Sequence, residues 1–486
     1  MVLPFIGILV SLAFLIFFAY RGHSVIFIAP VAAMIAVLFS GAPLLASYTQ
    51  IFMPALGGFI VNFFPVFLVG AIFGRLMSVS GYAEDLARWI SKALGAQRAI
   101  LATSIASALL TYGGVSAWVV VFAMYPIAQA LFKEAGIPKR LMPAAIALGF
   151  FSFAMAALPG SPQIHNAIPT RYFETTTFAA PLLGTLGAIV TYALGMAWLT
   201  WRQKKLISAG ESYGPDLDPG SPATASISPE ENDAPLTGGG VGVLNRVQTR
   251  ERVVTKGLIA LVPILVVVTV NFLFVYVLSE TMNFDYLAEE RFGATTLSSV
   301  IGVWSVTVAL ATAVIAIFLM RPRQAQEYVD GISEGAKTAV LPAFTTASEV
   351  GYGGVIASLA IFAVIREGIF EVSDNALVVA ALSTAVIAAI TGSSSGGLSI
   401  ALQSFGADLA RMADEQGISP ELMHRVTAMA SVSFDSLPHN GAVITLLLVC
   451  GLTHRQSYKD IGMVTVIAPF IGFLVVMGIA LVISGN

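Results

Sequence analysis

Cysteine and charge are both scarce in this chain of 486 residues. Cys450 is the single cysteine, which excludes an intrachain disulfide and leaves no basis for a cysteine-based metal site. Asp, Glu, Lys and Arg together form 11% of the residues, whereas soluble domains carry about 25%. The His-Glu-x-x-His pattern of zinc hydrolases is also missing. The composition therefore excludes an ordinary soluble protein, and we expect neither a metal nor a cofactor.

Apolar residues take the place of the missing charge. They form 57% of the chain, with a mean hydropathy of +0.84. Stretches of about 20 apolar residues match the hydrocarbon thickness of a bilayer and predict an all-α polytopic membrane protein. The N-terminus lacks the positive start of a cleavable signal, so 2–19 is expected to remain as the first span. The other predicted spans are 24–41, 54–78, 139–172 (broken), 178–201, 257–278, 294–320, 338–364, 421–453 (broken) and 462–483.

Two further apolar stretches, 98–133 and 376–413, are too long for one span and carry glycine motifs in their middles. We interpret each as a re-entrant hairpin that enters and leaves on one side. Lys and Arg favour cytoplasmic loops, and with both termini outside, only five of the 25 Lys and Arg fall on the outer side. Making either hairpin a full span would spoil this bias. The five are Arg171, Arg291, Arg366, Arg411 and Arg425.

The glycine motifs occur in duplicate. Residues 113–116 read Gly-Gly-Val-Ser and 396–399 read Gly-Gly-Leu-Ser, and each is followed downstream by a second break containing Leu-Pro. An offset of 281 also aligns identical residues at seven positions between 136 and 153. Duplicated broken segments are typical of secondary transporters that bind substrate at the repeat interface. We predict two inverted-topology repeats, 1–203 and 253–486, each with about five spans, one re-entrant hairpin and one broken helix.

Two segments differ from the membrane spans. The segment 204–252 is rich in proline, glycine and scattered acids, so it cannot bury enough apolar surface to order itself. It is predicted to be a flexible cytoplasmic linker, and a regulatory role stays open. Residues 82–94 place apolar and charged side chains on opposite sides at helical spacing, which predicts a short helix lying in the membrane interface.

Small and polar residues gather at four predicted breaks, the hairpin tips at 111–116 and 391–399 and the helix breaks at 158–166 and 433–441. Irregular backbone at membrane depth survives only around a protein-lined cavity, and half-helix N-termini favour an anion. The exposed carbonyls would equally suit a cation. The alternative is that glycine and serine only permit close helix packing. The candidate substrate-binding residues are Tyr112, Gly113, Gly114, Ser116, Ser161, His165, Asn166, Ser394, Ser395, Gly396, Gly397, Ser399, Ser436, His439, Asn440 and Gly441.

Glu349 and Asp435 are the acids that this topology places at membrane depth. A carboxylate there costs at least about 2.5–3.5 kcal/mol on insertion scales, so it is usually kept for function. The residue aligned with Asp435 in the first half is Ala154, so this acid is an asymmetry added to the repeat. We predict Asp435 as the proton-coupling group and Glu349 as a second proton site. Helix capping by Asp435 and an internal ion pair of Glu349 remain open alternatives.

Histidines occupy both predicted helix breaks. An imidazole titrates near neutrality and can donate to a carboxylate, so His165 and His439 are candidates for substrate binding or proton relay, although a packing role is open for each. His23, His424 and His454 are predicted to lie in loops with no role.

The run Ser-Phe-Asp-Ser-Leu-Pro-His-Asn-Gly-Ala-Val at 433–443 resembles the gluconate permease family of the ion transporter superfamily. Gly-Leu-Thr-His at 451–454, Tyr-Lys-Asp at 458–460 and the Ser-Ser-Gly-Gly hairpin tip belong to the same resemblance, which covers nearly the whole chain. It implies proton-linked import of small hydroxy acids such as gluconate, a homodimer and an elevator motion. The run at 433–443 is most similar to the 3-hydroxybutyrate permease branch. The helix break of the first half lacks the His-Asn-Gly found in the break of the second half, so the resemblance does not imply equal roles for the two breaks.

These patterns together predict secondary active import of a small hydroxy-carboxylate with a proton across the bacterial inner membrane, without a nucleic-acid partner. Sodium coupling is the first alternative, because carbonyls and serine hydroxyls also coordinate Na⁺. A passive anion channel is a second. An intramembrane hydrolase is a third, and it would need a nucleophile, a base and an orienting group in register.

Overall fold

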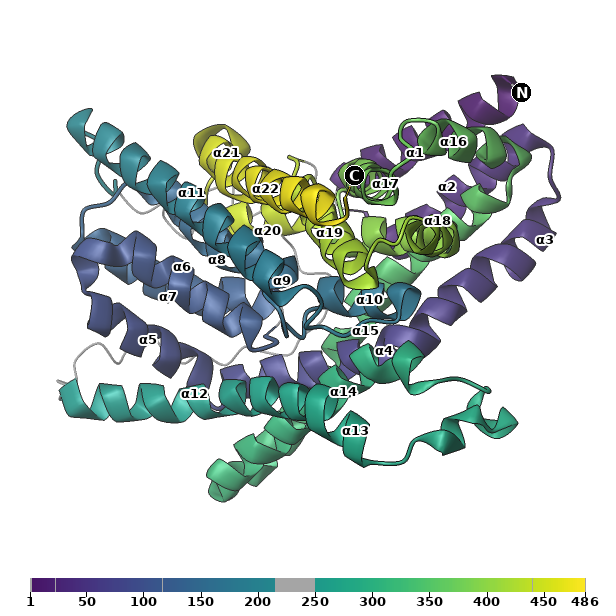
Figure 1. Ribbon diagram of the computed structural model, residues 1–486. Helices are drawn as coiled ribbons and strands as arrows, with labels where there is room; N and C mark the ends of the chain where they lie inside the picture. The colour runs from purple at the N-terminus through teal and green to yellow at the C-terminus, as the bar shows by residue number, and fades with distance from the viewer. Residues whose placement is uncertain (1, 22, 116, 215–249, 439, 486) are drawn as a thin grey trace.

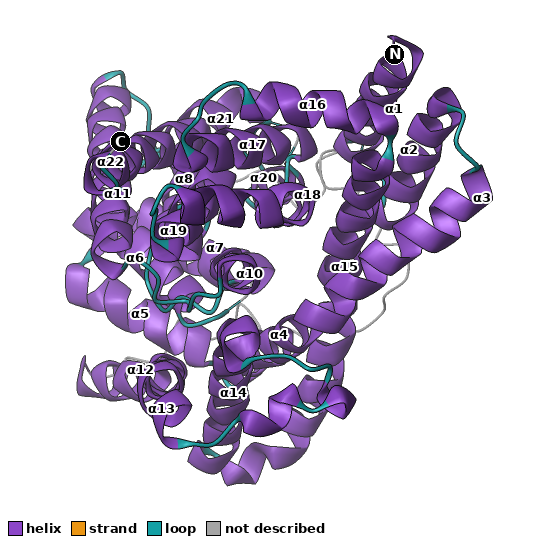
Figure 2. Cartoon of the chain, turned by 45° about the vertical axis from the view of Figure 1, so that its right-hand side comes forward, coloured by secondary structure: helices purple, strands orange, loops and turns teal. Residues whose placement is uncertain are grey.

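The computed structural model describes residues 2–21, 23–115, 117–214, 250–438 and 440–485. Every regular element in these ranges is helical, and no strand occurs in them (Figure 2). The all-α prediction is therefore confirmed. The helices fall into two groups, one built around two long helices that cross the molecule and one built from hairpins and broken helices (Figure 1).

The first group, called the scaffold helices below, centres on α4 and α15, which pack against each other along much of their length. α2 packs on α15 as α14 packs on α4, and α1 packs on α2 as α12 packs on α14. At the crossing of the long helices, a Cβ on Gly335 would lie 2.7 Å from the Cα of Ile72, so glycine permits the close approach. The bounds are α1 Val2–Tyr20, α2 Val25–Ser40, α3 Leu44–Ser47, a π-helical turn Tyr48–Phe52, α4 Met53–Val79, α12 Arg250–Leu273, a π-helical turn Phe274–Leu278, α13 Ser279–Thr281, α14 Leu297–Met320 and α15 Ala325–Ser358.

The second group, called the hairpin group below, contains two helix pairs and two interrupted helices. α6 packs with α7 and α17 with α18, while α6 also lies on α8 and α17 on α19. A Cβ on Gly149 of α8 would lie 2.3 Å from the carbonyl oxygen of Ser104 in α6, which explains the glycine there. The bounds are α6 Ala99–Tyr112, α7 Ala117–Glu134, α8 Met142–Phe150, α9 Phe153–Ala156, α10 Ile164–Phe173, α11 Pro181–Ser208, α17 Ala376–Thr391, α18 Ser394–Glu415, α19 Pro420–Ser433, α20 Gly441–Val449, α21 His454–Gly462, a π-helical turn Met463–Ile467 and α22 Ala468–Ile483.

The two halves of the chain place their elements in one order: two helices, a long helix, a short helix, a helix pair, an interrupted helix and a final long helix. Contacts between the halves also come in matched pairs, since α10 packs on α18 and α20 packs on α7. The interruptions fall at 157–163 and 434–440, within three residues of the bounds predicted for the two breaks, 158–166 and 433–441. The opposite orientation of the halves in a membrane stays a prediction.

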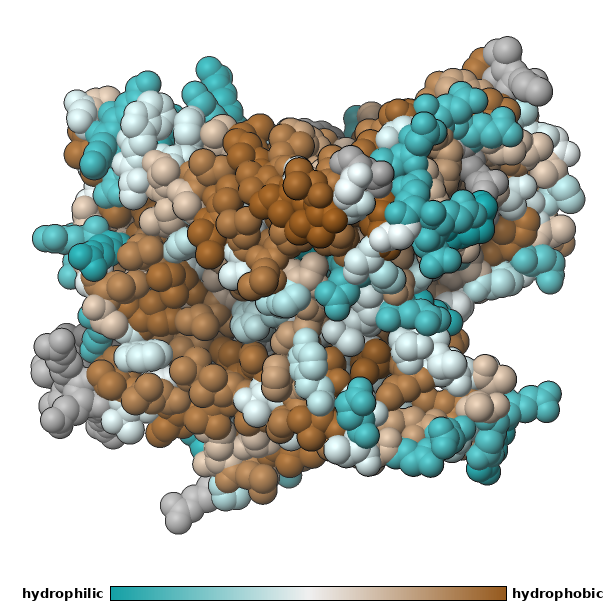
Figure 3. All heavy atoms as spheres, viewed as in Figure 1, coloured by the Kyte–Doolittle hydropathy of each residue, from teal (hydrophilic) through white to brown (hydrophobic). Residues whose placement is uncertain are grey.

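The surface has the character of a protein that contacts lipid. Large apolar side chains stand exposed on several long helices, among them Leu182 at 86% and Val482 at 79%. Apolar residues cover the middle of the face shown in Figure 3, and hydrophilic residues collect at its edges. Six helices in the described ranges are long and apolar enough to cross a membrane, or up to eight if each of two bent pairs forms one span. A soluble monomer would not expose apolar surface of this extent.

Two predicted element boundaries differ from the structure. The predicted span 338–364 is wrong, because α15 begins at Ala325 and ends at Ser358, and extended backbone at Leu359 turns the chain into α16 (Ala360–Phe370). Hydropathy averages over such a bend and cannot detect it. α11 runs on to Ser208, beyond the predicted start of the linker, and Tyr213 is buried after it with Lys133 over its ring. Residues 215–249 of the predicted linker lie outside the described residues.

The amphipathic segment forms α5 (Tyr82–Leu94). Leu86 and Ile90 of its apolar side are buried, whereas Ala93 is exposed, and the helix packs on α12 and α6. The axes of α5 and the helix leading into α6 differ by 106°. α5 therefore joins the scaffold helices to the hairpin group through a sharp turn, while its position in a membrane interface stays a prediction.

Candidate substrate and coupling site

Asn440 ties the second hairpin tip to the second helix break. Its Oδ1 accepts hydrogen bonds from the amides of Ala442 and Val443, at 2.7 and 3.0 Å, and so caps the N-terminus of α20. Its Nδ2 donates to the carbonyl oxygens of Gly392 and Asp435, at 2.9 and 3.1 Å. One buried side chain thus satisfies the start of α20, the tip between α17 and α18, and the break itself.

Asp435 is buried in this break, with 1% of its surface exposed. Its carboxylate accepts a hydrogen bond of 2.8 Å from the hydroxyl of Ser436, and Ser394 of the hairpin tip also lies against it. The hydroxyl of Tyr458 in α21 donates to the carbonyl of Ser436 at 3.0 Å and steadies the same turn. Hydroxyl and backbone amide groups surround this carboxylate, and it is not in an ion pair of the described residues.

The first half repeats this tie between tip and break with other side chains. The hydroxyl of Tyr112 donates to the carbonyl of Pro159 at 2.9 Å. Gln163, in the break, donates through Nε2 to the carbonyl of Thr111 at 2.7 Å. Gln163 was not among the predicted binding residues, although its place in the duplicated break was a signal for it.

The two halves meet where His165 contacts Ser394. The imidazole Nε2 of His165, in the first turn of α10, lies 2.6 Å from the hydroxyl oxygen of Ser394, the first residue of α18. Both side chains are buried. Because Ser394 also lies against Asp435, one hydroxyl connects the first helix break, the second hairpin tip and the second helix break. Segments of opposite halves therefore meet here, while substrate binding at this junction stays a prediction.

Glu349 stands at the interface between the scaffold helices and the hairpin group. It is buried on α15, and its Oε2 accepts a 3.2 Å hydrogen bond from Ser393. Ser393 also caps α18, because its hydroxyl accepts from the amide of Gly396 at 3.1 Å. The carboxylate therefore lies at the N-terminus of α18, where the helix dipole favours negative charge. An ion pair of Glu349 with a Lys or His was left open above, and the structure places Ser393 and Gly396 beside it instead.

The remaining predicted residues have other surroundings. The side chains of Ser161 and Asn166 bond to backbone inside the first break, Ser161 to Ala154 O and Asn166 to Ser161 O and Thr177 O. Ser399 donates back to Ser395 O within α18. A Cβ added to Gly441 would have no neighbour within 4 Å, whereas a Cβ added to Gly113, Gly114 or Gly397 would press on Ile264, Leu310 or Ala388, respectively. Ser116 and His439 lie outside the described residues.

Sequence reasoning missed two buried polar residues of α19. His424 was predicted to lie in a loop, and that is wrong, because it lies inside α19. The side of the membrane on which Arg425 lies stays a prediction, and both side chains are fully buried. His424 lies 2.7 Å from the hydroxyl of Thr175 and 3.2 Å from Asn166 Oδ1. The signal was present in the sequence: Ser419 and Pro420 mark a helix start, so residues 424 and 425 belong inside the helix.

The second hairpin tip also reads Gly-Ser-Ser-Ser-Gly at 392–396, which fits the Gly-x-Ser-x-Gly pattern of serine hydrolases. Ser394, its middle serine, even has the imidazole of His165 within reach. The other ring nitrogen, Nδ1, is buried without a hydrogen-bond partner among the described residues. No carboxylate therefore orients this ring, and the tip joins two helices rather than a strand and a helix. Among the described residues the arrangement therefore lacks the orienting group of a catalytic triad.

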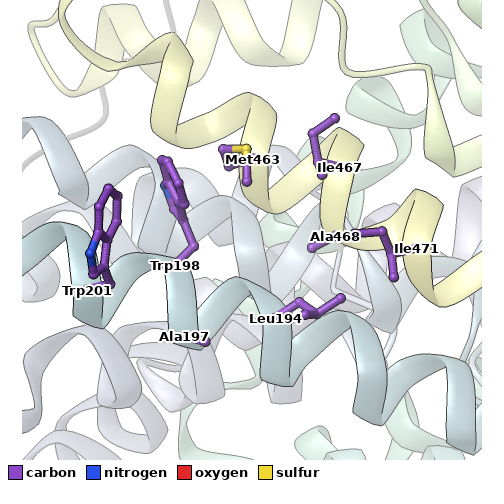
Figure 4. Close-up of a pocket in the computed structure, with 8 residues that line it drawn as sticks. All are labelled: Leu194, Ala197, Trp198, Trp201, Met463, Ile467, Ala468 and Ile471. Atoms are coloured by element: carbon purple, nitrogen blue, oxygen red, sulfur yellow. The ribbon is translucent and has the colours of Figure 1, made fainter.

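Two cavities lie away from this junction. The larger, about 340 Å³, is a groove between α11 and the helix at the C-terminus (Figure 4). Apolar side chains form its walls, so it offers little to an acidic substrate. The other, about 290 Å³, is lined in part by Lys139 and Arg140 at the start of the first broken helix and by Gln456 in the first turn of α21. Arg140 forms an ion pair of 3.3 Å with Glu211 there.

Comparison with known proteins identifies the family. A family described as GntP family permease matches residues 3–210. An uncharacterized transporter of Bacillus subtilis, YxjC, is 43% identical over 477 residues, which cover 96% of this chain and 97% of the relative. An uncharacterized transporter of Haemophilus influenzae is 31% identical over 144 residues, 29% of this chain and 32% of the relative. The solved structure of the YdaH transporter of Alcanivorax borkumensis has a TM-score of 0.45 at 15% identity, covering 88% of this chain and 86% of that one. The resemblance seen in the sequence is confirmed, and the chain belongs to the GntP permease family of multi-pass membrane transporters.

Proposed function

We propose that the protein is a secondary active transporter that imports a small hydroxy-carboxylate of the gluconate or 3-hydroxybutyrate class together with a proton. The observation that carries this proposal is the buried junction of His165, Ser394 and Asp435 between segments of both halves. A carboxylate at such a place is usually kept for function. The hydroxyl groups beside Asp435 can form hydrogen bonds with its carboxyl group whether that group is protonated or ionised, because a hydroxyl both donates and accepts.

The substrate class follows from the chemistry around this junction. α10, α18 and α20 each begin at a break, so three positive helix ends lie in the same part of the molecule and favour an anion. Gly441, at the start of α20, has open space beside it. Serine hydroxyls and an imidazole can form hydrogen bonds with the hydroxyl groups of a hydroxy acid. The buried acid of the site disfavours a substrate that carries a second or third carboxylate.

An elevator motion is part of the proposal. The hairpins and interrupted helices pack on one another, and the scaffold helices pack around α4 and α15. Movement of the hairpin group along the scaffold would carry the junction from one side to the other. We further propose inverted repeats, a homodimer in the bacterial inner membrane with both termini outside, and a cytoplasmic linker, because the matched element order and the distribution of Lys and Arg favour them.

Uptake in proteoliposomes tests the proposal. A thermal-shift screen with gluconate, 3-hydroxybutyrate, lactate and citrate selects the substrate, and radiolabelled uptake is then measured with an inward proton gradient, with an inward sodium gradient and with neither. The expected result is accumulation driven by protons without sodium. Accumulation driven only by sodium would replace proton coupling by the sodium alternative, and equilibration without accumulation would indicate a channel.

Asp435→Asn is the decisive variant for coupling. It keeps the size of the side chain and removes its ability to exchange a proton, so concentrative uptake is expected to be lost while substrate counterflow remains. Asp330→Asn, the same chemical change at an exposed position of α15, serves as the control and should transport like the parent. Unchanged accumulation and pH dependence in Asp435→Asn would remove this residue from the coupling role.

A further inference from the structure

Arg425 is a charged side chain sealed inside the protein. It lies in the second turn of α19, has none of its surface exposed, and is among the largest fully buried side chains of the described residues. An arginine in such a place retains its charge, since guanidinium does not deprotonate under ordinary conditions. Burying a cation is costly unless other groups compensate it, so its partners show what the protein uses it for.

Oxygen atoms from residues on both sides of the first helix break surround the guanidinium. Nε and Nη2 donate to the carbonyl of Ala179, at 3.1 and 2.6 Å. Nη1 donates to the carbonyl of Ala156 and, at 3.0 Å, to Oδ1 of Asn166. These three oxygens come from the end of α9, from α10 and from the loop before α11. They form a cluster, called the oxygen cage below, that belongs to the first half of the chain, whereas the cation comes from the second half.

The cage compensates the charge without a carboxylate. No ion pair of Arg425 with an acid is present among the described residues. Glu421, one turn earlier on α19, interacts with it at longer range and accepts a hydrogen bond from the amide of Ala180. Carbonyl and amide oxygens gathered around a cation are also the ligand set that binds alkali metal ions in membrane proteins.

α11, the helix beside the oxygen cage, has a glycine where it approaches Arg425. A Cβ on Gly184 of α11 would lie 2.3 Å from the carbonyl oxygen of Ala157 and 2.9 Å from Nε of Arg425. Any larger residue at position 184 would push the guanidinium out of the cage. The glycine and the arginine therefore form one fitted arrangement.

We propose that the guanidinium of Arg425 is a built-in cation that fills the oxygen cage of the first helix break, so that this break takes no mobile coupling ion. Removing the side chain would turn the cage into a site for a small monovalent cation, guanidinium first and Na⁺ second. The claim that this break takes no coupling ion rests on the proposed transport function, whereas the claim that a cation occupies the cage does not.

Chemical rescue of Arg425→Ala tests the proposal on the full-length purified protein. Its melting temperature is expected to fall by several degrees, and low millimolar guanidinium is expected to recover at least half of that loss along a saturating curve. Choline, which is too large for the cage, should not do so, and the parent should not respond to guanidinium. Arg411→Ala, which removes an exposed arginine of α18, is the control for loss of a positive charge and should behave as the parent does.

Two further variants keep the test decisive if Arg425→Ala does not fold. Arg425→Lys retains a cation and should fold and transport without sodium, whereas Arg425→Gln retains donors without the charge and should lose stability and uptake. Equal behaviour of the Lys and Gln variants, or equal effects of choline and guanidinium on Arg425→Ala, would overturn the proposal. If uptake by the parent proves to be sodium-driven, the proposed proton coupling fails, but guanidinium rescue still decides whether the cage is a cation site.

Discussion

Gly396→Ala would drive a methyl group into the contact between the scaffold helices and the second hairpin tip. A Cβ at this position would lie 1.7 Å from Oε2 of Glu349, 2.6 Å from its Cδ and 3.0 Å from the hydroxyl of Ser393. The carboxylate would have to retreat by more than an ångström, which breaks its hydrogen bond with Ser393. Glycine at this point is therefore required by the close approach of the buried acid.

The cost can be worked out from the structure. Overpacking of a well-packed site costs about 1–3 kcal/mol, and loss of the Ser393 hydrogen bond adds about 1 kcal/mol. Position 396 lies in the first turn of α18, where alanine would recover up to about 1 kcal/mol relative to glycine. The free energy of unfolding should thus fall by about 2 kcal/mol. Because Glu349 stands between the two groups of helices, the fractional loss of uptake should exceed the fractional loss of folding free energy.

Thermal melting and uptake in proteoliposomes measure the two effects. Gly58→Ala is the matched control, since position 58 is also helical and a Cβ added there would have no neighbour within 4 Å. Its melting temperature should stay equal or rise. In the Glu349→Ala background the added methyl has room, so Gly396→Ala should then cost little. The reasoning is refuted if Gly396→Ala lowers the melting temperature equally with and without Glu349.

Two other variants examine the ties around the site. Asn440→Ala removes the cap of α20 and its bonds to the second tip, so melting should report a loss of about 1–2 kcal/mol or more, and a value near zero would show that water replaces the cap. Asp460→Ala removes a fully buried carboxylate and leaves the partly buried guanidinium of Arg202 and the indole of Trp198 without their shared acceptor, at a cost approaching about 3 kcal/mol. Glu334→Ala, which breaks a solvent-exposed pair with Lys337, should leave the melting temperature almost unchanged, and equal losses in the two variants would contradict the argument from burial.

The positions of the breaks could be predicted from the sequence because their causes are local. Glycine, proline and clustered polar residues interrupt a helix wherever they occur, and apolar stretches of fixed length leave them in view. The interruptions near 158 and 437 and the tips near 114 and 393 were found in this way. The bend after Ser358 escaped prediction, because apolar residues continue through it and no proline marks it.

The partners of the polar side chains could not be predicted in the same way. Asp460 belongs to a polar stretch of the sequence, yet it is fully buried and pairs with Arg202. Arg425 was counted among the outer positive charges from the predicted span topology, and the sequence around it does not show that its guanidinium is buried. Its burial depends on carbonyl groups that lie more than 240 residues away along the chain, and no local pattern reports them.

Helices, membrane spans, two similarly ordered halves and membership of a permease family could be predicted from local patterns, since composition, periodicity and motif are properties of the chain alone. The contact of His165 with Ser394, the place of Glu349 beside a hairpin tip and the oxygens around Arg425 became visible in the folded arrangement. A buried polar group must find partners wherever the packing of distant helices supplies them, and no local pattern contains that packing.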